Sequence, residues 1–237
     1  MIRKIRSVAS GIRSLGPRLF RPRMYQSARE SWSQEGEDLI LARFMEPRTT
    51  GFYVDIGGHD PFRFSNTAFF HARGWSGLVV EPDPDGARVI RQYRPKDMVV
   101  NLGVAQARSE MTFFRFNEPA LNTFSAELAR QRQQIDGYHT IEETRVLVDR
   151  LDNILSERLP AAQKIDFMTV DAEGFDLEVL KSNDWNRFRP EMVVAECFDL
   201  DLTQPAEDPV VSFMASVGYD LVAKAANSAF FAARRTA

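Results

Sequence analysis

Four acidic side chains of this sequence stand at or beside the points where apolar runs stop. Asp55 closes the run "FYVD", Glu81 ends "GLVVE", Asp171 ends "IDFMTVD" and Glu196 ends "EMVVAE". In an open α/β sheet, ligands bind outside the carboxyl ends of the strands, so these carboxylates are expected on one rim. Carboxylates on one rim repel each other unless a cationic or hydroxyl-rich ligand lies among them. The pattern therefore predicts a site for such a ligand.

A glycine turn follows the first of these runs, in the stretch "DIGGHDP". A turn of this kind often holds a nucleotide, but a pyrophosphate needs a third glycine where Pro61 stands, and Asp55 would repel it. S-adenosylmethionine carries a sulfonium and an ammonium group and no phosphate. Asp55 would attract this cofactor, and Glu81 could accept hydrogen bonds from its ribose hydroxyls. The residues of the turn therefore favour S-adenosylmethionine over a dinucleotide.

The elements that must position these residues follow an α/β pattern. Short continuous apolar runs indicate strands that are covered on both faces, and helical segments separate many of them. The expected strands are "GFYVDI", "GLVVEP", "DMVVNLGVA", "MTFFRF", "TRVLVDRL", "IDFMTVD", "EMVVAECF", "YDLVAK" and "SAFFAA". The expected helices span residues 31–45, 65–73, 84–94, 174–182 and 209–217. The predicted fold class is α/β with a Rossmann-like, doubly wound, mostly parallel sheet and a C-terminal antiparallel hairpin.

Two segments carry expectations of their own. Ser31 and Gln34 have the spacing of a capping box, which predicts that the first helix begins at Ser31 and ends before Pro47. Residues 118–143 are polar, rich in Gln and Arg, and lack a clear strand pattern. We expect this segment to form a lid or loop over the mouth of the sheet.

The charges are distributed unevenly along the chain. Residues 1–29 hold eight basic and no acidic side chains, whereas the rest holds 22 basic and 33 acidic ones. We therefore expect a basic N-terminal extension, residues 1–29, and one α/β domain, residues 30–237. The extension is either a solvated tail or a basic amphipathic segment that contacts anionic lipid through residues 1–23. Charges interrupt its apolar runs, so a signal peptide is not indicated.

The acidic body argues against a nucleic-acid partner, because no basic groove for phosphates is indicated. No apolar run is long enough to span a membrane. The single cysteine, Cys197, cannot form an internal disulfide, which suits a reducing compartment. We expect a cytoplasmic protein, with peripheral contact at the inner membrane face as the alternative. The sequence does not determine the oligomeric state.

Five blocks of the sequence occur in a fixed order: "SQEGEDLIL", "FYVDIGGHDPFRFSNT", "RGWSGLVVEPDP", "IDFMTVDAEGFDLEVLKS" and "RPEMVVAE". In this order and spacing they resemble the FkbM family of S-adenosylmethionine-dependent methyltransferases. The resemblance covers roughly residues 31–200 and implies the Rossmann-like class I methyltransferase fold. It also implies methylation of a hydroxyl, often on a sugar of a glycan, a glycolipid or a secondary metabolite.

The resemblance implies a set of cofactor-binding residues. They are Asp55, Gly57 and Gly58 in the loop, Glu81 at the ribose, and Gly103 and Val104 on the adenine side. Ser65, Asn66 and Thr67 follow the loop and have two open interpretations. They either contact the methionine end of the cofactor or only cap the next helix.

Methyl transfer to an alcohol requires in-line positioning and removal of the hydroxyl proton. The candidate catalytic residues are Asp171, Glu173 and His59. Asp171, Glu173 and Glu196 are also candidate ligands of Mg²⁺, a candidate second cofactor. Structural alternatives stay open: Glu173 as a first-turn helix acid, Glu196 as a buried partner of an Arg or a backbone amide, and His59 as a hydrogen-bonded loop residue.

The predicted function is S-adenosylmethionine-dependent O-methylation of a carbohydrate or glycoconjugate, with a small-molecule or glycan acceptor. One alternative is a nicotinamide-dependent sugar oxidoreductase, because Glu81 would bind that ribose equally well. The sequence lacks GxGxxG and Tyr-x-x-x-Lys, which argues against it. The other alternative is a non-catalytic binding module that retains the cofactor pocket.

Overall fold

The computed structural model describes residues 27–234. The chain divides into two units, Met1–Glu30 and Ser31–Ala237, and the following architecture is that of the second. Almost all of the predicted basic extension, including the proposed lipid contact through residues 1–23, lies outside the described residues. Within the described part, no helix combines the length and apolar character needed to cross a membrane.

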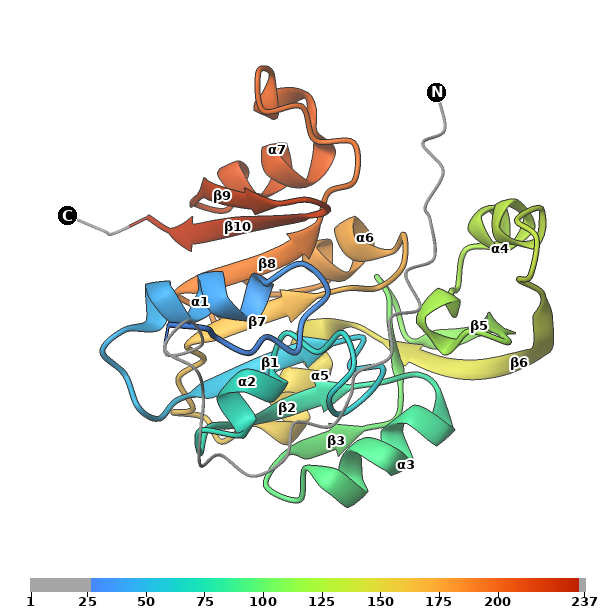
Figure 1. Cartoon of the computed structure of the whole chain (residues 1–237), viewed down its shortest axis with the longest axis horizontal. Helices are drawn as coiled ribbons and strands as arrows, with labels where there is room; N and C mark the ends of the chain where they lie inside the picture. Colours follow the sequence, from blue (N-terminus) through green and yellow to red (C-terminus); the bar gives the residue numbers. More distant parts are fainter. Residues whose placement is uncertain (1–26, 235–237) are drawn as a thin grey trace. The chain divides into compact units, whose positions relative to one another are not determined.

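A seven-stranded sheet forms the centre of this unit, in the order β3-β2-β1-β7-β8-β10-β9 (Figure 1). Its strands are β1 (Phe52–Ile56), β2 (Ser76–Val80), β3 (Met98–Val100), β7 (Phe167–Val170), β8 (Met192–Glu196), β9 (Tyr219–Ala225) and β10 (Ser228–Ala233). Neighbours from β3 to β8 pair in parallel, whereas β10 runs antiparallel to both β8 and β9. The predicted fold class, with its closing hairpin, is confirmed. The strand order reverses beside β1 and β7, which creates a crevice at their carboxyl ends.

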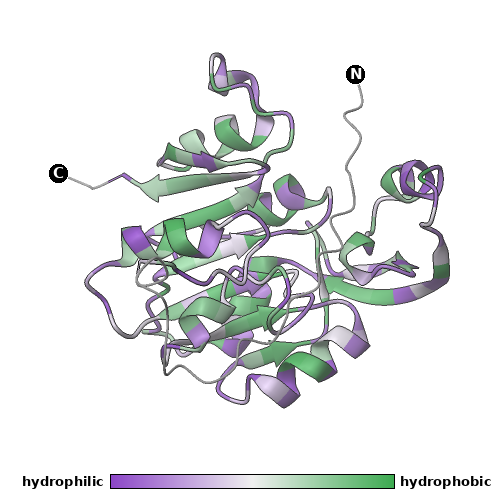
Figure 2. Cartoon of the chain, in the orientation of Figure 1, coloured by the Kyte–Doolittle hydropathy of each residue, from purple (hydrophilic) through white to green (hydrophobic). Residues whose placement is uncertain are grey.

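Helices cover both faces of the main sheet. The core on one face includes side chains of α1 (Glu37–Met45), α2 (Ala68–His71) and α3 (Pro84–Tyr93). The core on the other face includes side chains of α5 (Leu151–Arg158), α6 (Asp176–Lys181) and α7 (Pro209–Ser216). Figure 2 shows hydrophobic residues along the strands between these layers. Because neither face meets water, the strands are continuously apolar, which made them recognisable in the sequence.

The sequence places the starts of α3 and α7 correctly, where an aspartate caps the helix and a proline is its first residue. Asp83 accepts a hydrogen bond from the amide of Asp85 over 3.0 Å, and Pro84 occupies the first position of α3. Asp208 and Pro209 open α7 in the same way. An aspartate cap satisfies amide groups that lack a helical partner, and proline has no amide hydrogen to satisfy.

The first helix begins later than the sequence predicts. The expected capping box of Ser31 and Gln34 does not start it, since α1 begins after Gly36, whose φ of 89° lies in the left-handed region. The hydroxyl of Ser31 donates instead to Oδ1 of Asp38 over 2.6 Å. Asp38 is fully buried, and its carboxylate holds the preceding segment in a non-helical conformation. The prediction of a helix from Ser31 is therefore wrong.

A second, three-stranded sheet contains β4 (Gly103–Val104), β6 (Thr140–Asp149) and β5 (Ser109–Phe116), in that order. Figure 1 shows the β5–β6 ribbon and α4 (Ala126–Gln133) projecting from the side of the main sheet. The run "DMVVNLGVA" is thus divided between β3 and β4. Residues 118–143 contain the 3-10 helix Pro119–Leu121, α4 and the first residues of β6, so the prediction that they lack a strand is wrong at their end.

Candidate active site

A cavity of about 420 Å³ opens at the carboxyl ends of β1, β2 and β7. Its walls come from the turns after these strands, from β4 and β5, and from the connector residues 119–124. The volume lies in the range of small-molecule and cofactor sites. Its position at the reversal of strand order is where open α/β sheets bind ligands.

Glu81 lines this cavity and holds two turns in place. Its carboxylate, in a residue that is only 5% exposed, accepts the amide of His59 and the amide of Asp83, each over 2.7 Å. Each carboxylate oxygen retains a further lone pair for a ligand hydroxyl. Burial raises the pKa of Glu81 to about 7, although the two amides oppose the rise. The site thus contains a preformed pair of hydrogen-bond acceptors.

Gly57 allows the ends of β1 and β7 to approach each other. Its φ is 84°, and a Cβ there would lie 1.9 Å from the backbone oxygen of Asp171. Gly57 lines the cavity, whereas Gly58 does not. A Cβ on Gly58 would instead lie 2.3 Å from Cγ1 of Val79, on a core strand. Gly57 therefore allows two backbone segments to approach at the cavity, whereas Gly58 allows the turn to pack against the core side chain of Val79.

Asp55 lies outside the lining of the cavity. Its carboxylate accepts the hydroxyl of Thr67 over 2.5 Å, and Nη2 of Arg94 donates to the same hydroxyl oxygen over 2.8 Å. Nη1 of Arg94 also donates to Ser65 Oγ over 3.3 Å. Burial raises the pKa of Asp55, and the charge of Arg94 opposes the rise. The structure places Asp55, Ser65 and Thr67 in one buried network, apart from the cavity wall.

Three predicted acidic residues are brought together across β7 and β8. One carboxylate oxygen from each of Asp171, Glu173 and Glu196 lies within 4.8 Å of the others. Among the described residues, Oδ1 of Asp171 and Oε2 of Glu196 are buried without a hydrogen-bond partner. The pKa values of Asp171 and Glu196 are raised mainly by burial and, to a smaller extent, by repulsion from the neighbouring carboxylates.

Glu173 is connected to the segment that we predicted as a lid. Its carboxylate forms an ion pair with Arg132 of α4, and its backbone oxygen accepts the hydroxyl of Thr123 over 2.8 Å. Burial raises the pKa of Glu173, and Arg132 opposes the rise. Arg132 also donates to the backbone oxygen of Leu121 over 2.8 Å. The connector is therefore fastened to the turn that carries the acidic cluster.

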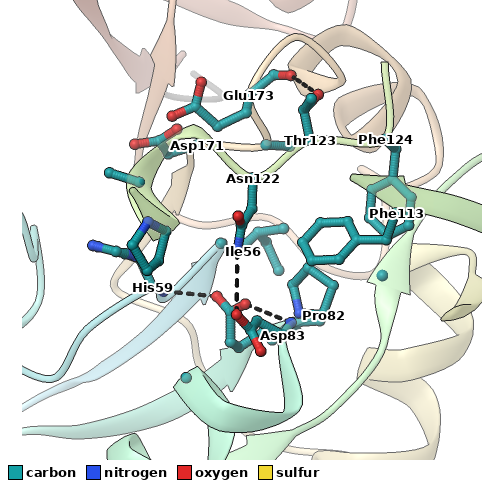
Figure 3. A pocket seen from close by; sticks show the side chains of 18 of the residues that line it. Ile56, His59, Pro82, Asp83, Phe113, Asn122, Thr123, Phe124, Asp171 and Glu173 are labelled. Carbon is teal, nitrogen blue, oxygen red and sulfur yellow. Dashed lines mark hydrogen bonds between the residues drawn. The ribbon is translucent and has the colours of Figure 1, made fainter. Parts of the chain in front are cut away.

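His59 also lines the cavity, and its Nε2 is buried without a partner among the described residues. Burial and the nearby charge of Arg63 lower the pKa of His59, so the imidazole is neutral at pH 7. Figure 3 shows His59 and Asp171 on one side of the cavity and Phe113 and Phe124 on the opposite side. The cavity therefore has one polar and one apolar end.

The apolar end contains residues that the sequence did not reveal. Phe113 and Phe124 face each other with ring centroids 4.7 Å apart. The predicted Gly103 and Val104 line the same end, and a Cβ on Gly103 would lie 2.5 Å from Phe124. Asn122 donates to the carboxylate of Asp83 over 3.1 Å and links the connector to the start of α3. Aromatic side chains from a second sheet give no local signal that they reach this cavity.

Residues 55–221 match the family model described as the methyltransferase FkbM domain. The chain belongs to the FkbM methyltransferase family. It is an S-adenosylmethionine-dependent methyltransferase, and the resemblance seen in the sequence is confirmed. This membership decides against the nicotinamide-dependent oxidoreductase. No curated protein sequence matches the chain closely enough to supply a relative.

Solved structures with a similar fold are distant in sequence. A TehB-like SAM-dependent methyltransferase from Corynebacterium glutamicum is 13% identical, with 84% of this chain and 88% of that one covered and a TM-score of 0.40. A fibrillarin/Nop5p complex gives 12% identity, coverage of 86% and 81%, and a TM-score of 0.47. A SAM-dependent methyltransferase from Thiobacillus denitrificans, in complex with S-adenosyl-L-homocysteine, is 10% identical. The match covers 85% of this chain and 73% of that one, with a TM-score of 0.39. These likenesses do not identify an acceptor.

Proposed function

We propose that this FkbM methyltransferase methylates a hydroxyl of a carbohydrate or glycoconjugate, with Asp171 as the base. The observation that supports this assignment is the unpartnered, buried Oδ1 of Asp171 in a residue that lines the same cavity as Glu81. Glu81 would hold the cofactor's ribose while Asp171 faces the reacting hydroxyl. Whether carbohydrate or glycoconjugate, the acceptor is a small molecule or carries a group small enough to reach this cavity.

The cavity fits the charge of S-adenosylmethionine. Its lining holds six carboxylates and two guanidinium groups, a balance that favours a cationic ligand and disfavours a pyrophosphate. Glu81 offers two acceptor oxygens to a ribose diol, and Gly57 leaves room for the ligand beside the backbone. Gly103, Val104 and the two phenylalanine rings form an apolar end that suits the adenine base.

The buried network gives Asp55 a positioning role in this proposal. Asp55, through Thr67 and Arg94, fixes the segment that follows the glycine turn. Ser65 belongs to the same network, while Asn66 donates to the hydroxyl of Thr169 over 2.9 Å. We propose that these residues shape the methionine end of the cofactor site from behind the loop.

The chemistry at the polar end is the removal of one proton. When bound, the cofactor would supply the methyl group from its sulfonium, and the S–CH3 bond would break with its electron pair left on the sulfur of S-adenosyl-L-homocysteine. As the acceptor oxygen forms its bond to that methyl carbon, Oδ1 of Asp171 takes the hydroxyl proton. Burial and the neighbouring acids raise the pKa of Asp171, so that its ionised form is a stronger base than an ordinary aspartate. Glu173, whose charge Arg132 balances, and the neutral His59 are the second candidates for handling this proton.

The predicted Mg²⁺ is a separate proposal for the same cluster. Oxygen atoms of Asp171, Glu173 and Glu196 lie close enough to share one cation. The ion pair of Glu173 with Arg132 already neutralises one of the three, which weakens the case for a resident cation. Turnover that is lost on chelation and restored by added Mg²⁺ would support the metal, and chelator-insensitive turnover would remove it.

Calorimetry and turnover test the assignment together. We expect the full chain to bind S-adenosyl-L-homocysteine in preference to NAD. Asp171→Asn should bind it about as tightly as the wild type, whereas turnover on a competent sugar should fall by about 10² to 10⁴. Near-normal turnover of Asp171→Asn would remove this residue from the mechanism. Cofactor binding without turnover on any hydroxylated acceptor would favour the non-catalytic module.

Partners and location beyond the acceptor are also proposals. The acidic balance of the body supports the absence of a nucleic-acid partner. The proposed cytoplasmic location rests on the single cysteine, and the proposed peripheral lipid contact rests on the basic composition of residues 1–23.

A further inference from the structure

A small polar recess adjoins the cofactor cavity, and Gln34, Phe64 and Asp171 line both. Its volume of about 20 Å³ is enough for roughly one oxygen-sized group. Its polar walls include Glu37, Asn66, Glu196, Asn227 and Ser228. The recess therefore adjoins the polar end of the cavity at Asp171.

Phe64 stands at the junction of the two spaces in an unusual conformation. It is 40% exposed, and its φ of 57° lies in the left-handed region that is costly for an aromatic residue. The guanidinium of Arg63 lies 4.3 Å from the ring centroid and forms two hydrogen bonds to Glu118, over 2.7 and 3.1 Å. The connector thus supports a ring that no apolar core requires at this position.

The recess is lined by four acidic side chains and contains no basic one. The carboxylate of Glu37 already accepts the hydroxyl of Ser228 over 3.1 Å. Oδ1 of Asp171 and Oε2 of Glu196 have no partner within the described part of the chain. A hydroxyl, which can both donate and accept a hydrogen bond, suits this lining, whereas the four acids would disfavour a carboxylate or a phosphate.

We propose that Phe64 and this recess form the acceptor subsite, and that it selects an uncharged sugar ring over an anionic one. The apolar C–H face of the ring lies on Phe64, one hydroxyl enters the recess and forms a hydrogen bond with Glu196, and a neighbouring hydroxyl meets Asp171. An exposed aromatic face beside a polar recess fits a ligand with one apolar face and a hydroxylated edge. The inference rests on the proposed function, because it assumes a hydroxylated acceptor.

The test uses the full chain saturated with S-adenosyl-L-homocysteine. Saturation-transfer NMR measures the binding of methyl glucoside, methyl galactoside, methyl mannoside and methyl rhamnoside, with methyl glucuronide as the anionic counterpart. We expect at least one neutral glycoside to bind and the glucuronide to bind at least about tenfold more weakly, a ratio that corresponds to 1.4 kcal/mol.

Phe62 provides the matched control, since it is 46% exposed two residues away and lines neither space. Phe64→Ala should weaken glycoside binding by about tenfold, the loss expected for one aromatic contact, and Phe64→Tyr should restore it. Phe62→Ala should change it less than about twofold. All three variants should give the wild-type circular-dichroism spectrum and a cooperative thermal unfolding transition, which shows that they fold.

Equal binding of the glucuronide, unchanged binding by Phe64→Ala, or no binding of any neutral glycoside to the loaded protein would each overturn the acceptor subsite. Failure of the wild type to bind S-adenosyl-L-homocysteine would instead overturn the cofactor assignment on which it rests.

Discussion

Replacing Glu81 with Gln should separate the stability of this enzyme from its cofactor binding. Burial holds the pKa of Glu81 at about 7 in the folded protein, against 4.5 for an unperturbed glutamate. A difference of this size corresponds to about 3 kcal/mol between the protonated and ionised forms. Because the folded state binds this proton more tightly, the stabilisation is complete below pH 4.5. It is lost as the pH rises to about 7.

The measurement is denaturant unfolding of the cofactor-free wild type and Glu81→Gln between pH 5 and 8. Other buried acids remain in both proteins, so the difference between the two curves isolates Glu81. From pH 5 to 8 we expect the wild type to lose about 2 to 3 kcal/mol relative to the variant. Gln can accept only one of the two amides with its oxygen, so a pH-independent penalty of about 1 kcal/mol will accompany this change. A difference that does not vary with pH would refute the reasoning.

Cofactor affinity should depend on pH in the opposite direction to stability, since it should be higher when Glu81 is ionised. Glu81→Gln should bind S-adenosyl-L-homocysteine about 10- to 150-fold more weakly at pH 8, because charge-assisted hydrogen bonds to the ribose are worth about 1.5 to 3 kcal/mol. Wild-type affinity should fall as the pH drops below about 7, when Glu81 takes up its proton. The variant should lose this pH dependence. Unchanged affinity at pH 8 would place the ribose elsewhere.

Three further predictions concern Gly57, Arg132 and the N-terminal extension. Gly57→Ala should weaken binding of S-adenosyl-L-homocysteine and lower the free energy of unfolding by about 1 to 3 kcal/mol, because its Cβ would overlap the backbone oxygen of Asp171; unfolding curves and calorimetry that match the wild type would contradict this. Arg132→Met should speed proteolysis within residues 118–139, whereas the exposed control Arg130→Met should not. If the N-terminal extension binds lipid, deleting residues 1–23 should abolish sedimentation with anionic liposomes and leave cofactor binding intact.

The sequence by itself determined the fold class and the family. The parallel strands are covered on both faces, so their apolar runs are continuous, and aspartate and proline mark the starts of α3 and α7. The positions of Glu81, Asp171 and Glu196 at strand ends were also predictable, because parallel strands bring their carboxyl ends to one edge. These features depend on local pattern and on a general rule of sheet topology.

Only the tertiary structure decided which side of a turn each residue faces. Asp55 belongs to a buried network because its carboxylate accepts the hydroxyl of Thr67, to which Arg94, distant in sequence, donates in turn. Phe113 reaches the cavity because β5 belongs to a second sheet, and Phe124 reaches it from the connector that follows β5; strand periodicity does not specify the partner strand. Long-range pairing sets such contacts, and a single sequence carries no local record of it.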